Sequence, residues 1–121
     1  MRVFRIVGVA LAVLLLGTAG GFAHTFLERA EPRVGSTLKT SPTEVRLWFS
    51  DHLEPASSGV QVVNEAGEQV DKGADQVDPS NSVLLQVSLP SLPPGVYKVI
   101  WSVRSVDGHT VGGDFTFRVA P

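Results

Sequence analysis

The most informative stretch for the fold is Tyr97-Lys98-Val99-Ile100-Trp101-Ser102-Val103. Successive side chains of a β-strand point to opposite faces, so the residues at 97, 99, 101 and 103 share one apolar face and those at 98 and 102 lie opposite. The same alternation recurs at residues 45–49, 83–89 and 115–119. These four segments predict strands with one face in a hydrophobic core.

Shorter segments with strand character lie at residues 26–31, 60–64 and 69–72, and turn-forming Gly, Pro, Asn, Asp and Ser separate the apolar runs. Residues 62–67 and 68–72 are predicted to form a hairpin around Asn64-Glu65-Ala66-Gly67. No window has a sustained helical period. About seven short strands in one small domain predict an all-β fold, a Greek-key β-sandwich of immunoglobulin-like shape.

The N-terminal segment has the features of a secretory signal peptide. Arg2 and Arg5 precede an apolar run at residues 7–16, and Gly21 and Ala23 place small residues before a cleavage point. The sequence therefore predicts a leader at residues 1–23, cleavage after Ala23, and an exported domain at residues 24–121, in the periplasm or otherwise outside the cytoplasm. The alternative is an uncleaved anchor, although the apolar run is shorter than the roughly 20 residues of a membrane span.

The composition excludes several classes of function. The chain has no cysteine, which rules out disulfides, zinc–cysteine sites, cysteine nucleophiles and blue-copper centres. Without the leader, eight basic and twelve acidic residues remain and no basic run occurs, so nucleic acid is not an expected partner.

Cleavage after Ala23 would make His24 the first residue of the exported protein. Its α-amine and imidazole Nδ1 could then chelate one metal ion. A second candidate is Asp107-Gly108-His109, which follows the strand at 97–103 and offers a carboxylate and an imidazole one residue apart. Nitrogen and oxygen donors of this kind suit copper(II), and we predict one copper(II) ion bound by His24, Asp107 and His109. The alternative is an ordinary Asp-Gly-His turn and a histidine without function at the cleavage site.

Asp51 and His52 follow the strand at 45–49. Asp51 is a weaker candidate, as an axial ligand or as an acceptor for an imidazole N–H. His52 is more simply a surface histidine, and Glu54 is expected to be solvated. The only methionine, Met1, leaves with the leader, so the exported chain has no sulfur donor for copper(I).

Taken together, these segments resemble the CopC family of exported copper-binding proteins. The resemblance rests on His24-Thr25-Phe26, Glu31-Pro32, Gly35-Ser36, Leu47-Trp48-Phe49-Ser50-Asp51, Leu92-Pro93-Pro94-Gly95-Val96-Tyr97, Trp101-Ser102-Val103 and Ser105-Val106-Asp107-Gly108-His109. It implies a cupredoxin-like β-barrel or sandwich that binds copper(II) through an N-terminal histidine, a later histidine and a carboxylate. His24, His109 and Asp107 match those positions, and Asp51 stands where some members carry a glutamate. Residues 62–78 lack the methionine-rich segment through which some members bind copper(I).

The function implied is copper(II) sequestration or transport for copper homeostasis, resistance or import, by a monomer that is not an enzyme. A CopD-type membrane protein is the partner the resemblance implies, and we expect it to be a separate chain. Two alternatives remain open. One is a small copper-dependent oxidase or monooxygenase with an N-terminal histidine brace, and the other is a metal-free immunoglobulin-like interaction module.

Overall fold

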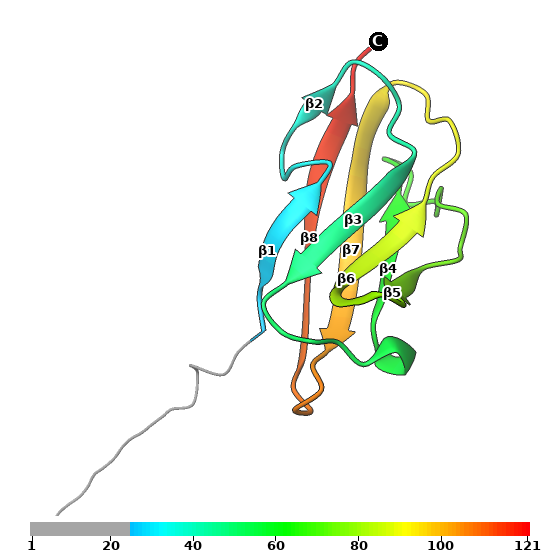
Figure 1. Cartoon of the computed structure of the whole chain (residues 1–121). Coiled ribbons are helices and arrows are strands. Elements are labelled where there is room, and N and C mark those ends of the chain that lie inside the picture. The colour runs from blue at the N-terminus through cyan, green and yellow to red at the C-terminus, as the bar shows by residue number, and fades with distance from the viewer. Residues whose placement is uncertain (1–24) are drawn as a thin grey trace, which may run out of the picture.

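The computed structural model describes residues 25–121, which form two β-sheets packed face to face (Figure 1). The predicted leader, its cleavage point and His24 lie outside the described residues. Within residues 25–121 the only helix is a single 3-10 turn, η4 (Pro55–Ser57), and no helix there is long and apolar enough to cross a membrane.

Each sheet has four strands. The first sheet has the order β1 (Leu27–Glu31), β3 (Glu44–Phe49), β6 (Asn81–Ser88) and β5 (Gln76–Asp78), and all its pairs are antiparallel. The second has the order β2 (Thr37–Leu38), β8 (Thr110–Val119), β7 (Gly95–Arg104) and β4 (Gly59–Val63). Here β2 runs parallel to β8 and the other pairs are antiparallel. The predicted β-sandwich is confirmed.

The core lies between the sheets, where the alternating residues of the long strands meet. Val45, Leu47 and Phe49 of β3 are at most 1% exposed, as the period of two predicts. Aromatic rings connect the layers, because Phe49 packs edge-on against Trp101 of the other sheet with 5.1 Å between ring centroids. Burying a side chain of this size contributes about 1.5–3 kcal/mol, so a filled interior can hold the domain together without disulfides.

Three short segments differ from the prediction. Residues 25–121 contain eight strands, whereas about seven were predicted. The short strands β2 and β5 are the additional ones. Conversely, residues 69–72 form no strand: Gln69 makes one isolated bridge with Val63, and Val70 donates its N–H to the Val62 carbonyl at 2.8 Å. The predicted hairpin around Asn64–Gly67 is therefore present only as a turn, with the contacts of Gln69 and Val70 to the end of β4 beside it.

Trp48 lies on the outer face of its sheet, because it alternates with the buried residues of β3. Two arginines cover it, with the Arg29 guanidinium 4.5 Å and the Arg46 guanidinium 5.0 Å from the ring centroid. The cation–π contacts and the arginine stems explain how a large indole stays half-buried outside the core.

The outer edge of β4 is covered by carboxylates of the loop that follows it. Asp75 accepts the Val60 N–H at 3.0 Å and Asp71 accepts the Val62 N–H at 2.7 Å. Gly59 permits this approach, since a Cβ there would lie 2.8 Å from Oδ2 of Asp75. These edge N–H groups are thus satisfied although β4 has a neighbouring strand on one side only.

Candidate metal centre

The first described residues are fixed to the end of β3. Phe26 donates its N–H to the Ser50 hydroxyl, and Ser50 donates its N–H to the Phe26 carbonyl, both at 2.9 Å. Thr25 is 4% exposed and its hydroxyl donates to Oδ2 of Asp51 at 2.9 Å. The residue that follows His24 in the chain is therefore held beside Asp51.

The segment after β3 is also joined to the loop between β7 and β8. Val106 donates its N–H to the His52 carbonyl at 3.0 Å, and Leu53 forms an antiparallel bridge with Ser105. The start of β1, the loop after β3 and the β7–β8 loop consequently lie at the same end of the sandwich (Figure 1). The chain entering at Thr25 and the Asp107–His109 turn share this end.

The β7–β8 loop is a tight turn that holds Asp107 and His109 together. Ser105 donates its N–H to the His109 carbonyl and Gly108 donates its N–H to the Ser105 carbonyl, both at 2.9 Å. Gly108 has φ +96°, a left-handed conformation that favours glycine. As a result, Oδ1 of Asp107 lies 3.6 Å from Nδ1 of His109, and both side chains are about half exposed.

Hydrogen bonds favour the charged form of the Asp107 carboxylate. The Ser105 hydroxyl donates to Oδ1 of Asp107, and the His109 N–H approaches the same oxygen at 3.4 Å. The Ser105 bond is the largest cause that lowers the pKa of Asp107 below its ordinary value, and the charge of His109 adds to it. An accessible anionic oxygen beside an imidazole can coordinate a divalent cation.

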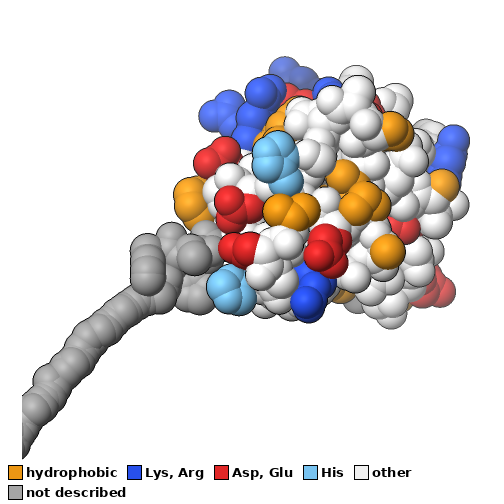
Figure 2. Space-filling view, turned by 60° about the horizontal axis from the view of Figure 1, so that its bottom comes forward, with side chains coloured by type: hydrophobic (Ala, Val, Ile, Leu, Met, Phe, Trp, Pro, Cys, Tyr) orange, Lys and Arg blue, Asp and Glu red, His pale blue; other side chains and the backbone are white. Residues whose placement is uncertain are grey.

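The other two candidates have different positions. Asp51 is half-buried and holds Thr25, so the structure places it next to the N-terminal segment. His52 is exposed, and its Nδ1 lies 2.5 Å from the Ser82 hydroxyl at the start of β6. Figure 2 shows this end of the molecule with two separate histidine side chains among acidic and apolar ones. Among the described residues no three His, Asp or Glu side chains gather closely enough to hold a metal ion, so the predicted centre depends on His24.

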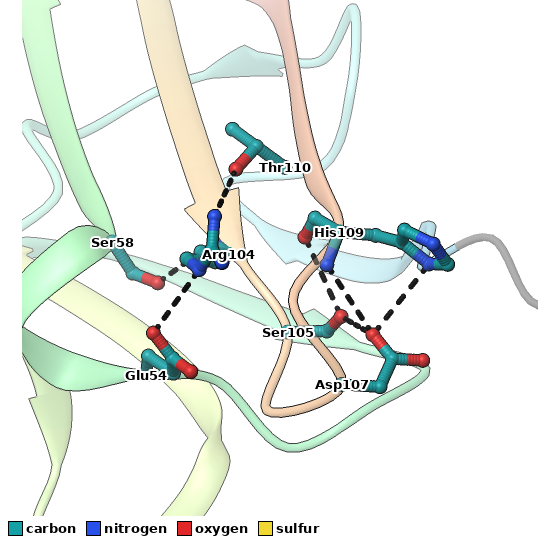
Figure 3. Close-up of polar contacts among 7 residues, drawn as sticks. All are labelled: Glu54, Ser58, Arg104, Ser105, Asp107, His109 and Thr110. Atoms are coloured by element: carbon teal, nitrogen blue, oxygen red, sulfur yellow. Dashed lines mark hydrogen bonds and ion pairs between the residues drawn. The ribbon is translucent and has the colours of Figure 1, made fainter.

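An ion pair lies behind the turn. Nε of Arg104 is 3.3 Å from Oε1 of Glu54, and the guanidinium donates to the Thr110 hydroxyl at 3.5 Å (Figure 3). A Cβ on Gly108 would lie 3.4 Å from Nη2 of Arg104, so the guanidinium packs against the turn. The sequence reading of Glu54 as a solvated residue missed this partner, because the contact joins segments about 50 residues apart.

Comparison with known proteins identifies the family. Residues 27–120 match the CopC domain, and the chain belongs to this family. Protein YobA of Escherichia coli K12 is 33% identical over 113 residues, covering 91% of both chains. Copper resistance protein C of Pseudomonas syringae pv. tomato is 31% identical and covers 87% of both chains. Copper transport protein CutJ of Bacillus subtilis is 30% identical, but the chain spans only 21% of its length.

Solved structures agree with this assignment. CopC from Methylosinus trichosporium OB3b superposes with a TM-score of 0.72 and 34% identity, covering 81% of this chain and 95% of that one. PcoC, a methionine-rich copper resistance protein from Escherichia coli, gives a TM-score of 0.67 and 28% identity, covering 80% and 99%. The β-sandwich of this family is the fold observed here.

Proposed function

We propose that the exported protein binds one copper(II) ion at the end of the sandwich formed by Thr25, Asp51 and the Asp107–His109 turn. The ligands are the α-amine and imidazole of His24, the imidazole of His109 and the carboxylate of Asp107. Asp51 positions the N-terminal segment through Thr25. Family membership and the names of the copper-resistance relatives support copper as the metal.

The observation that carries the proposal is the convergence of two segments far apart in the sequence. Thr25 is anchored to Asp51 at 2.9 Å, and the same loop is anchored to Val106 through the His52 carbonyl at 3.0 Å. Because residue 24 directly precedes Thr25, this anchoring supports His24 as a ligand at the end where Oδ1 of Asp107 and Nδ1 of His109 lie 3.6 Å apart.

The donor set favours copper(II) over copper(I). Amine and imidazole nitrogens with a carboxylate oxygen suit the tetragonal preference of copper(II), whereas copper(I) prefers sulfur. Residues 24–121 contain neither methionine nor cysteine. The protein would therefore sequester copper(II) or carry it without a copper(I) site of the soft-donor type.

A carrier needs a recipient, and we propose a CopD-type membrane protein in that role, with this chain acting as a monomer. A metal held at an exposed end of a rigid domain can be presented to another protein without unfolding. A bound carboxylate also stabilises copper(II) relative to copper(I), which disfavours redox cycling and supports a binding role rather than catalysis.

The test is a copper(II) titration of the protein beginning at His24, with its electron paramagnetic resonance spectrum. One ion should bind, with nitrogen coordination. His109→Ala should weaken binding by at least about tenfold, the loss expected for a metal-ligand residue or its close partner. His52→Ala is the matched control, because that imidazole contacts Ser82, and it should change affinity less than about twofold.

A second variant tests the N-terminal ligands. One extra residue before His24 removes the chelate of amine and imidazole while leaving every side chain in place. It should bind copper(II) far more weakly than the native start. Equal behaviour of His109→Ala and His52→Ala, or full affinity in the extended protein, would contradict the ligand set.

A further inference from the structure

The Glu54–Arg104 ion pair lies directly against the turn that carries the proposed ligands. Arg104 ends β7, and its Nη2 is 3.4 Å from where a Gly108 Cβ would lie. Gly108 is flanked on either side by Asp107 and His109. Figure 3 shows Arg104 and Glu54 on one side of the turn, and the carboxylate of Asp107 with the ring of His109 on the other.

A guanidinium in this position could weaken cation binding at the turn in two ways. An arginine without a partner pairs readily with a nearby carboxylate, in a forked geometry that can occupy both oxygens. Asp107 is the adjacent carboxylate on the turn. An uncompensated positive charge would also repel a divalent ion by Coulomb interaction, and solvent would weaken this repulsion because both side chains of the pair are partly exposed.

Glu54 removes both effects. Its carboxylate lies 3.3 Å from Nε of Arg104 and neutralises the guanidinium. The pair is held in place by backbone contacts, because the Glu54 N–H donates to the Arg104 carbonyl at 2.8 Å and the Arg104 N–H donates to the Ser58 hydroxyl at 3.1 Å. The Asp107 carboxylate meanwhile accepts from Ser105 and His109.

We infer that Glu54 is a positioning residue for the metal centre, the counter-ion that holds Arg104 away from Asp107 and keeps this carboxylate available to the metal. The inference rests on the proposed copper function. It assigns a role to two residues outside the proposed ligand set.

The experiment is a double-mutant cycle measured by copper(II) competition titration at low ionic strength. Glu54→Gln should raise the dissociation constant by about threefold to tenfold, the effect of one freed charge near a divalent ion, and the effect should shrink in high salt. The Glu54→Gln/Arg104→Gln double variant should return to within about twofold of the native protein. Simple loss of stability cannot produce this rescue, because the double variant also lacks the ion pair.

Glu44→Gln is the matched control, since Glu44 faces Arg46 at 4.0 Å on β3, and it should leave copper affinity unchanged. Native affinity in Glu54→Gln, or a double variant as weak as Glu54→Gln, would overturn the inference while His109→Ala still weakens binding. If His109→Ala binds as the native protein does, the metal site itself is misassigned and both proposals fall.

Discussion

Ser105 is a buried residue whose hydroxyl acts on Asp107, one of the proposed ligands. It is 1% exposed and donates to Asp107, whose pKa it lowers. Ser105→Ala should therefore raise the pKa of Asp107 toward the ordinary value near 4. An NMR titration of the Asp107 carboxyl carbon measures this directly, with the exposed Ser102→Ala as control. An unchanged pKa would contradict the assigned hydrogen bond.

The lowered pKa of Asp107 also determines how the free energy of unfolding changes as the pH falls. The folded pKa of Asp107 is below its unfolded value, so the group adds stability at pH above the unfolded pKa, and that stability is lost as pH falls through the folded one. Ser105→Ala should lose less stability than the native protein between neutral pH and about pH 3. Urea unfolding at both pH values provides the comparison.

At the level of strands, the pairing of β7 with β8 places an indole over a glycine. Trp101 pairs with Gly113, and a Cβ there would lie 2.6 Å from Cζ2 of the ring. Gly113→Ala should force Trp101 from its contact with Phe49 and cost about 1–3 kcal/mol of unfolding free energy. Urea denaturation would measure it, and Thr116→Ala, at an exposed position of β8, should cost less than about 0.5 kcal/mol. Equal midpoints for the two variants would refute the packing argument.

The strands that alternate strictly were predictable from sequence, and those without a period were not. β3 and β7 carry their burial pattern in their own residues, so periodicity finds them. β2 has only two residues and β5 is Gln-Val-Asp, and each becomes a strand because a longer neighbour supplies its hydrogen bonds. Local patterns cannot contain that information.

The candidate site also has a part that was predictable from sequence and a part that was not. Asp107 and His109 are separated by a single residue, so their proximity follows from the turn itself. The link from Thr25 to Asp51 and the pairing of Glu54 with Arg104 join residues that are distant in sequence and polar. Nothing in their local sequence marks a partner, which is why Glu54 reads as a solvated residue.

For the molecule as a whole, copper binding should be coupled to folding. The proposed ligands come from both ends of the domain's sequence, so the proposed site requires the folded sandwich to bring them together. Free copper(II) at 100 times its dissociation constant should raise the unfolding free energy by about 2.7 kcal/mol if the unfolded chain binds none. Urea unfolding with and without metal measures this gain, and His109→Ala at the same copper concentration should show little of it. A copper-independent midpoint for the native protein would contradict the site.

The carboxylates along β4 have a consequence for the self-association of the domain through its strand edges. An open strand edge is a template on which another chain can add its own strand, and repeated addition builds fibres. Asp71 and Asp75 occupy that edge with negative charge, and Gly59 keeps room for the second of them. Addition of a foreign strand at β4 is thereby disfavoured, and this protection depends on Gly59, because a Cβ there would lie 2.8 Å from the Asp75 carboxylate.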